Sequence, residues 1–192
     1  GQKMSKSKGN VIDPITVGDI YGFDAIRWYF YTNNQPGESK LMNEGNVKDQ
    51  VRRFFLVLWN TYSYFVTYAN LKKTSRVKGQ LSNVSLADKW LLSRKHSTIK
   101  KVTEALDVYD IFTAARAIED FTIELSTQYV RRNKKREDEA FLQVLRDTLV
   151  DISLMLAPFA PFVAESIYRN LTGEESVHLA EWQVCDEKQI DI

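Results

Sequence analysis

The stretch FFLVLWNTYSYFVTYANL, residues 54–71, is rich in aromatic and aliphatic side chains. Together with residues 44–53, its apolar positions recur in steps of three and four, which is the period of an α-helix. The resulting stripe consists of Val47, Val51, Phe54, Leu58, Tyr62, Phe65 and Ala69, and Phe55, Leu56, Trp59 and Tyr68 widen it. A helix that is apolar around so much of its girth is typical of the inside of a bundle. We therefore expect one long helix over residues 44–71 within a helical bundle.

The same period returns in the next part of the chain and predicts two more long helices. Ser85 and Asp88, three residues apart, indicate the start of the first, and Asp110 is placed to cap the second. The expected buried stripes are Trp90, Leu92, Ile99, Val102 and Leu106 in the first helix, and Ile111, Ala115, Ile118, Thr122, Leu125 and Tyr129 in the second.

A fourth long helix is expected to begin near residue 137, with Phe141, Leu145, Leu149, Ile152 and Leu156 facing inward. Pro158 and Pro161 should interrupt it, because proline lacks the amide donor and clashes with the preceding turn. A short fifth helix then ends before Gly173, since glycine commonly follows a helix.

The flanking segments complete the predicted architecture. The first 42 residues are expected to be a turn-rich connector followed by one helix over residues 25–32, with Asp24 as its cap. Residues 34–39 and 72–83 are expected to be polar loops. We predict an all-α fold: an up-down helical bundle over residues 43–175, preceded by a short irregular segment over residues 1–42. An extended tail, residues 176–192, should pack Val177, Leu179 and Trp182 onto the bundle.

Charge and composition limit the possible functions. The 192 residues carry 26 Lys and Arg against 25 Asp and Glu, so any basic function must be local. The single cysteine, Cys185, excludes a disulfide within the chain and suits a reducing compartment, which favours the cytoplasm. Two separated histidines with one cysteine form no metal-binding pattern, and no apolar run reaches the roughly 18 residues of a membrane span.

The opening segment GQKMSKSKGNVIDP, residues 1–14, is a candidate phosphate-binding loop. Phosphates are bound by ammonium groups, hydroxyls and the free amides of Gly-rich turns, and KMSKSKG offers all three. Lysine suits a mobile loop, and cationic charge that meets developing negative charge lowers a reaction barrier. The segment lacks GxxxxGK[ST] and is therefore no P-loop. The alternative, which composition by itself favours, is a solvated chain end with ordinary lysines.

A second candidate is YVRRNKKRED, residues 129–138, in which five of six consecutive residues are basic: Arg131, Arg132, Lys134, Lys135 and Arg136. The apolar stripe of the helix, extended beyond Tyr129, falls on Arg132, Lys135 and Arg136. These charged residues cannot face the hydrophobic core, so the helix must end there or overhang the bundle. Phosphate contacts from such a cluster would bind RNA with a steep salt dependence and little sequence reading. The alternative is a solvated helix end, whose charge the acidic residues 137–139 offset.

Several segments resemble a known family. KMSKS, residues 3–7, resembles the second signature of class I aminoacyl-tRNA synthetases, and its extension through residue 14 resembles the version in the isoleucine, valine, leucine and methionine enzymes. FFLVLWNTYSYFVTYANL (54–71), YVRRNKKR (129–136), LAPFAPFVAESIYRNL (156–171) and ESVHLAEW (175–182) resemble, in order, the anticodon-binding region of the isoleucyl members. The valyl members are the nearest competitor.

The resemblance implies a parent enzyme that activates isoleucine with ATP and Mg²⁺ and transfers it to tRNA. It assigns the catalytic contact with the ATP phosphates to Lys6, with Lys3, Ser5 and Ser7 supporting the loop, and tRNA contacts to the basic residues 131–136. Because the family's nucleotide-binding core lies upstream, we expect this chain to be an excised, inactive anticodon-binding fragment without a cofactor of its own, monomeric and cytoplasmic. The alternatives are the same region of a valyl enzyme and a helical protein-interaction scaffold.

Overall fold

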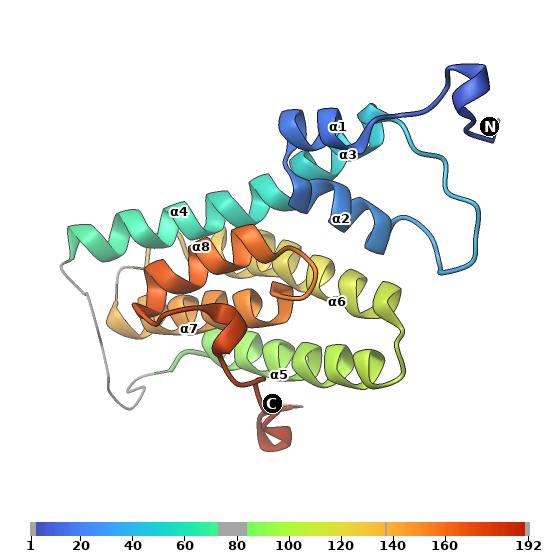
Figure 1. Cartoon of the computed structure of the whole chain (residues 1–192). Helices are drawn as coiled ribbons and strands as arrows, with labels where there is room; N and C mark the ends of the chain where they lie inside the picture. Colours follow the sequence, from blue (N-terminus) through green and yellow to red (C-terminus); the bar gives the residue numbers. More distant parts are fainter. Residues whose placement is uncertain (1–2, 73–83, 137, 191–192) are drawn as a thin grey trace.

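The computed structural model describes residues 3–72, 84–136 and 138–190 (Figure 1). Within these ranges the regular structure is helical and contains no strand. The α-helices are α1 (Pro14–Tyr21), α2 (Phe23–Thr32), α3 (Glu44–Gln50), α4 (Leu56–Leu71), α5 (Leu86–Asp107), α6 (Ile111–Glu124), α7 (Glu139–Leu156) and α8 (Pro161–Thr172). The predicted all-α class is confirmed.

The helix predicted over residues 44–71 forms, but a π-helical turn, η2 (Val51–Phe55), interrupts it between α3 and α4. The backbone stays in the right-handed helical region across both junctions, at Val51 and at Leu56. A second π-helical segment, η3 (Leu125–Val130), continues α6. A π turn adds one residue to a helical turn, and an apolar pattern in steps of three and four does not reveal such an insertion.

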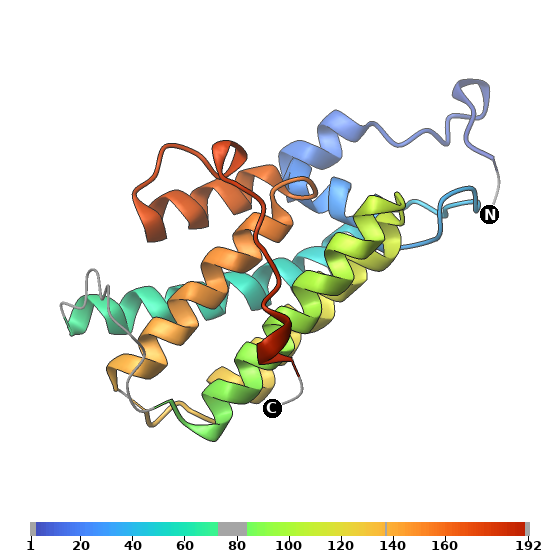
Figure 2. The same cartoon turned by 90° about the horizontal axis from the view of Figure 1, so that it is seen from below.

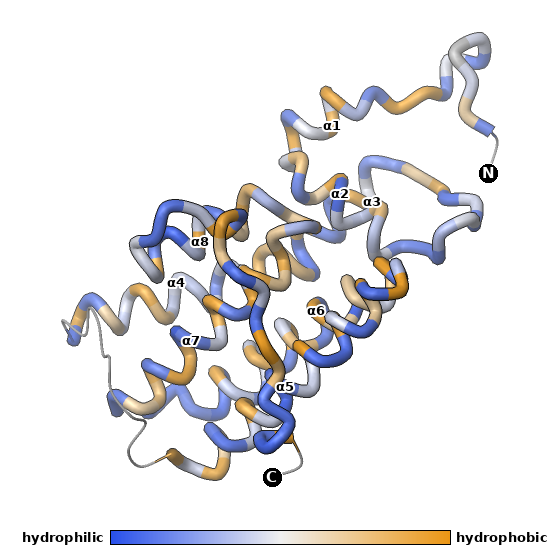
Figure 3. The backbone as a smooth tube through the Cα atoms, turned by 60° about the horizontal axis from the view of Figure 1, so that its bottom comes forward, coloured by the Kyte–Doolittle hydropathy of each residue, from blue (hydrophilic) through white to orange (hydrophobic). Residues whose placement is uncertain are grey.

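Helices α4 to α8 alternate in direction and form the predicted up-down bundle (Figure 1). Helix α5 packs along α6, and α7 packs along α8, while α4 and α5 both contact α7. Apolar and polar residues alternate along each helix (Figure 3), as expected for helices with one buried side. Among the residues of the predicted stripes, Phe54, Leu58, Ile118, Leu145 and Leu149 are fully buried.

The predicted helix ends are largely confirmed. Ser85 and Asp88 form a capping box at the start of α5, and the Asp110 carboxylate accepts a hydrogen bond from the backbone N–H of Thr113 at the start of α6. Helix α7 ends before Pro158, and Pro161 is the first residue of α8. Gly173 follows α8 with φ of 77°, the left-handed conformation that favours glycine.

The segment before the bundle contains more helix than expected. Helix α1 begins at Pro14, and the carboxylate of Asp13 caps it by accepting hydrogen bonds from the backbone N–H groups of Ile15 and Thr16. Gly18 lies inside α1, where the ring of Phe23 occupies the space that a larger side chain would need. Proline at the first position of a helix is favourable, because its missing N–H would have no partner there.

Asp24 has a different role from the predicted one. It lies within α2, which begins at Phe23 after Gly22. Its carboxylate accepts hydrogen bonds from the backbone N–H groups of Val163 (2.8 Å) and Phe162 (3.4 Å), at the start of α8. Asp24 therefore caps α8 rather than α2.

Two clusters of buried side chains hold these elements together. The large one fills the bundle, and the small one joins α1, α2 and α3 through Val17, Ile26, Tyr29 and Val47. Trp28 connects α2 to the large cluster, because its fully buried ring stacks on Phe54 with the ring centroids 4.1 Å apart. Since Val47 of α3 belongs to the small cluster, residue 42 does not separate the two cores. The domain boundaries remain a prediction.

The tail lies across the bundle and along α5 (Figure 2). Val177 is buried as predicted, but Leu179 is 72% exposed, so its predicted packing is wrong. Trp182 is 39% exposed, and its indole N–H donates a hydrogen bond to the hydroxyl of Thr103 on α5. In the stripe of α5, Leu91 is fully buried in place of Trp90 and Leu92, which are half-buried.

Candidate nucleic-acid interface

The first candidate site is the opening loop, which projects from the rest of the molecule (Figure 1). Its centre is a short 3-10 turn, η1 (Lys6–Lys8), followed by Gly9 with φ of 64°. Asn10 closes the loop: its side-chain oxygen accepts a hydrogen bond from the backbone N–H of Ser5 (2.8 Å), and its amide donates to the backbone carbonyl of Lys3 (3.3 Å). The hydroxyls of Ser5 and Ser7 lie 2.7 Å apart and share a hydrogen bond. The loop therefore has a defined local structure.

The side chains of Lys3, Ser7 and Lys8 in this loop are exposed. The side chain of Lys6 lies outside the part of the chain that the structure describes, so its catalytic role stays a prediction. Asn10 was not among the predicted site residues, although its place directly after the KSKG turn was a usable signal, because asparagine side chains commonly bond to nearby backbone.

The second candidate site is the turn that follows η3. The four residues Arg131, Arg132, Lys134 and Lys135, which we call the basic turn, all have exposed side chains. None of the four makes an ion pair with a carboxylate of the described residues. The backbone of the turn is held at its centre, because the Asn133 N–H and side-chain amide both donate to the carbonyl of Tyr129, at 3.1 and 2.8 Å. Four free cations on a held backbone are suited to bind phosphates.

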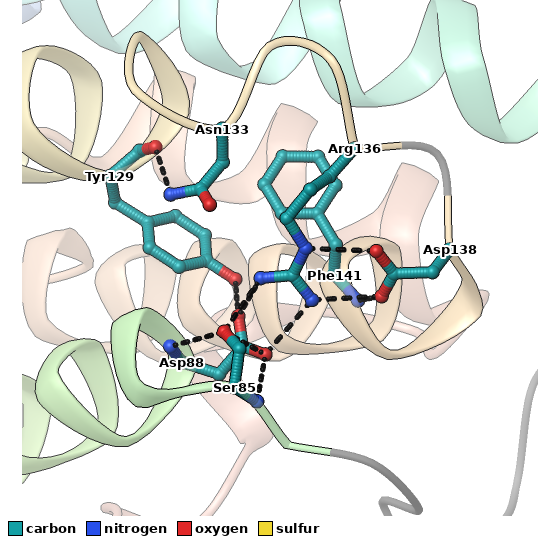
Figure 4. A network of polar contacts seen from close by, with 7 residues as sticks. All are labelled: Ser85, Asp88, Tyr129, Asn133, Arg136, Asp138 and Phe141. Carbon is teal, nitrogen blue, oxygen red and sulfur yellow. Dashed lines mark hydrogen bonds and ion pairs between the residues drawn. The ribbon is translucent and has the colours of Figure 1, made fainter.

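Arg136 differs from its four basic neighbours, because its guanidinium is bound within the protein (Figure 4). It donates to both carboxylate oxygens of Asp88, at 2.7 and 2.9 Å, and to both oxygens of Asp138, at 2.8 Å each. A further hydrogen bond reaches the hydroxyl of Ser85, and the guanidinium lies over the ring of Phe141. With its donors on two carboxylates, Arg136 is a structural residue here, and we leave it out of the candidate RNA contacts.

Asp88 is the buried centre of this network. It is fully buried, and besides Arg136 it accepts a hydrogen bond from the hydroxyl of Tyr129 at 2.6 Å. Burial alone would raise the pKa of Asp88, but the hydrogen bonds from Arg136, Tyr129 and Ser85 hold that pKa below its ordinary value. Burial and the bond to Asp88 raise the pKa of Tyr129 far above its usual range, so the phenol remains a donor.

Asp138 completes the network at the start of α7. Its carboxylate accepts a hydrogen bond from the backbone N–H of Phe141 and so caps the helix. The hydrogen bonds from Arg136 lower the pKa of Asp138 to about 2. Asp138 binds Arg136 rather than a residue of the basic turn. Arg136 carries one positive charge against the two carboxylates of Asp88 and Asp138, so the network keeps one negative charge, which offsets only part of the four positive charges of the basic turn. Of the other two acids expected to offset the basic turn, Glu137 lies outside the described residues, and Glu139, the first residue of α7, is exposed and makes no ion pair with the turn among the described residues.

The opening loop and the basic turn lie at opposite ends of the molecule (Figures 1 and 2). The loop precedes α1, and the basic turn lies where α7 begins. They cannot form a single small-molecule site, but both could contact one extended ligand.

The described residues also form grooves elsewhere on the surface, and two of them lie between helices. One, of about 390 Å³, is lined by residues of α5 and α6, among them the bidentate ion pair between Arg94 and Glu124. The other, of about 340 Å³, is mostly apolar and is lined by residues of α2, η2, α4 and α8, including Phe55 and Trp59.

Among the described residues, no cluster of three His, Cys, Asp or Glu side chains could hold a metal ion. None of the described helices is long and apolar enough to cross a membrane.

Comparison with known families gives two matches. Residues 88–192 match the family described as "Anticodon-binding domain of tRNA ligase". Residues 1–42 match the family described as "tRNA synthetases class I (I, L, M and V)". The two matches include the basic turn and the opening loop, respectively.

Curated relatives share this similarity along the chain. An isoleucine–tRNA ligase of Dehalococcoides mccartyi (strain CBDB1) is 46% identical over 206 residues, which cover 100% of this chain and 20% of that protein. An isoleucine–tRNA ligase of Thermus thermophilus is 45% identical over 202 residues, covering 97% of this chain and 19% of that protein. The chain thus spans about a fifth of the length of these relatives.

Solved structures share the fold at lower sequence identity. LeuRS of Agrobacterium radiobacter K84, solved in a ternary complex with tRNA and LeuAMS, aligns with a TM-score of 0.77 and 22% identity over 100% of this chain and 23% of that one. Methionyl-tRNA synthetase of Mycobacterium tuberculosis aligns with a TM-score of 0.75 and 21% identity over 86% of this chain and 35% of that one.

Proposed function

Because the chain belongs to the family of anticodon-binding domains of tRNA ligases, we propose that its helical bundle binds tRNA. The observation that carries the proposal is the basic turn, with four exposed cations that no described carboxylate pairs. Contacts from Arg131, Arg132, Lys134 and Lys135 to phosphates would position the RNA, while base contacts would specify it.

The proposed amino acid of the parent enzyme is isoleucine. Relatives at 41–46% identity over nearly the whole chain are named isoleucine–tRNA ligases, which supports this choice over the valyl alternative. A helical protein-interaction scaffold has less support, because the exposed basic turn favours an anionic partner.

In the parent enzyme, the opening loop would contact ATP during activation of isoleucine. Its exposed lysines and hydroxyls fit phosphate chemistry, with Lys6 as the proposed catalytic residue and Lys3, Ser5 and Ser7 supporting the loop. Asn10 would hold the loop in shape through its two bonds to the backbone. The described residues contain no carboxylate cluster for Mg²⁺, so we assign no Mg²⁺ ligand to this chain. We propose a monomeric state and a cytoplasmic location.

Titration of transcribed isoleucine tRNA with this chain tests the proposal, at about 50 and about 200 mM salt. We expect measurable binding at low salt and a marked loss of affinity at the higher concentration. Changing all four residues of the basic turn to glutamine should weaken binding and reduce the slope of log affinity against log salt by roughly 0.7–0.9 for each lost contact.

The matched control removes the same number of exposed cations elsewhere, by changing Lys48, Arg52, Lys101 and Lys188 to glutamine. This control variant has the same net charge as the basic-turn variant. If the basic turn itself contacts the RNA, only the basic-turn variant should lose most of its affinity for tRNA. Absence of binding at low salt would reject RNA binding by this chain. Equal losses in both variants would reject the basic turn as the site. Comparison with valine tRNA tests the choice of isoleucine.

A further inference from the structure

The network around Arg136 joins three helix ends at the base of the basic turn (Figure 4). Ser85 and Asp88 belong to the start of α5, Tyr129 to η3, and Asp138 to the start of α7. Arg136 binds side chains from two of these, and Asp88 connects it to the third through the Tyr129 hydroxyl. The six residues between Tyr129 and Arg136 are therefore tied at both ends to the same buried carboxylate, that of Asp88.

We propose that Arg136 and Asp88 are positioning residues for tRNA, which hold the basic turn in its binding conformation without touching the RNA. This inference rests on the proposed function. Long basic side chains on a free loop lose conformational freedom when they bind, and a backbone that is already held reduces that loss. The turn is held at its ends by the Asp88 network and at its centre by Asn133.

The geometry of the network explains why position 136 requires an arginine. A guanidinium offers five N–H donors in a planar fork, and Arg136 directs them at two carboxylates and one hydroxyl. An ammonium group has one nitrogen and cannot bridge Asp88 and Asp138 in this bidentate manner. Lysine at this position would keep the charge but lose the connection.

The Asp88→Asn substitution separates positioning from simple electrostatics. It removes a negative charge, so charge alone predicts equal or tighter binding of tRNA. If Asp88 positions the basic turn, the same substitution weakens binding, because the amide can no longer accept all the hydrogen bonds from Arg136 and Tyr129. We expect a loss of affinity of about tenfold at low salt, on the order expected when a preorganised site is loosened.

The Arg136→Lys and Arg136→Gln substitutions distinguish positioning from direct contact. Positioning predicts similar losses of affinity for both, with a salt slope close to that of the unchanged chain, since the four cations of the turn remain. If Arg136 itself contacts phosphate, lysine should retain most of the affinity and glutamine should lower the slope. That second result would overturn the proposal.

A matched control is a second ion pair, between the buried Lys95 and the partly buried Asp151, with 2.7 Å between its charged atoms. Asp151→Asn should also destabilise the fold but leave the basic turn and the tRNA affinity unchanged. Binding is measured at a temperature at which thermal unfolding shows each variant to be folded. If Asp151→Asn weakens binding as much as Asp88→Asn, the effect is general destabilisation, and the proposal is wrong.

Cleavage by trypsin within residues 131–136 provides a readout that needs no RNA. We expect faster cleavage there in Asp88→Asn than in Asp151→Asn, because only the former releases the turn. If Asp88→Asn does not fold, the Tyr129→Phe variant, which lacks one hydrogen bond to Asp88, is used in its place for both the binding and the cleavage measurement.

Should the unchanged chain bind no tRNA, the proposed function fails. Should it bind through the basic turn while Asp88→Asn and Arg136→Lys bind equally well, only the positioning role fails.

Discussion

At the scale of single residues, burial and partners separate side chains that look alike in the sequence. Arg136 and Arg132 both belong to one basic run, yet Arg132 is exposed while Arg136 binds two carboxylates. Neighbouring acids also differ: Asp88 is fully buried, whereas the side chain of Asp138 is 47% exposed. The function of a charged residue therefore depends on which carboxylates the fold brings to it.

Asp138 should make stability depend on acid pH. Arg136 lowers its pKa to about 2 in the folded chain, against an ordinary value of 3.8. Because the pKa of Asp138 is lower in the folded than in the unfolded chain, its ionised carboxylate adds to the free energy of unfolding. This contribution is fully present above pH 3.8 and is lost as the pH falls toward 2. Asp138→Asn keeps an acceptor for the cap but removes the charge. We expect the midpoint temperature of this variant to lie below that of the unchanged chain at pH 6, and the difference to shrink from about pH 4 to pH 2.

Circular dichroism melts between pH 2 and pH 7 give this difference directly. Glu175→Gln serves as the control, because Glu175 is exposed and lies on another part of the surface. A difference between Asp138→Asn and the unchanged chain that stays constant from pH 6 to pH 2 would contradict the role of the Arg136 pair.

Sequence reasoning placed the buried stripes well and the polar partners poorly. The steps of three and four located Phe54, Leu58 and Ile118 correctly, because local periodicity alone determines which side of a helix is apolar. The network of Asp88, Tyr129 and Arg136 joins residues up to 48 positions apart. No local pattern contains such a contact, so the sequence predicted five RNA-binding cations where the structure leaves four available.

At the scale of elements, helix ends were predictable wherever their partner is local. The Ser85 and Asp88 box and the Asp110 cap lie within four residues of the groups they bind. Asp24 acts across 139 positions, on Val163, and was therefore assigned to the wrong helix. Helix α8 has no side-chain cap of its own, since Ala160 precedes Pro161 at its start. The connector thus supplies a cap that the bundle lacks.

Removing the cap on α8 should destabilise the bundle from the connector side. Asp24→Ala should lower the free energy of unfolding by about 1 kcal/mol, the usual cost of losing an N-cap acceptor. Asp24→Asn keeps an acceptor oxygen and should cost less. Asp19→Ala, at an exposed position in α1, should change the free energy of unfolding little. Urea unfolding of the three variants measures these differences, and an equal stability of Asp24→Ala and Asp19→Ala would show that the cap is not used.

At the scale of the whole molecule, α2 ties the connector to the bundle. Trp28 stacks on Phe54, and the Arg27 side chain donates to the carbonyls of Pro158 and Phe159, between α7 and α8. The opening loop at one end and the basic turn at the other thus belong to one connected helical body (Figure 1). Such an arrangement suits an extended RNA better than a small ligand.

The same arrangement predicts that this chain alone does not activate isoleucine. The opening loop is exposed, and the two surface grooves described above are lined by other residues, so neither groove brings the loop together with a pocket for ATP and the amino acid. Most of an enzyme's rate depends on such positioning and on charges already arranged around the reacting atoms. We expect no isoleucine-dependent exchange of pyrophosphate into ATP above background, measured beside the isoleucine–tRNA ligase of Thermus thermophilus as the positive control. Exchange by this chain that disappears in Lys6→Ala would show instead that a complete active site lies within these 192 residues.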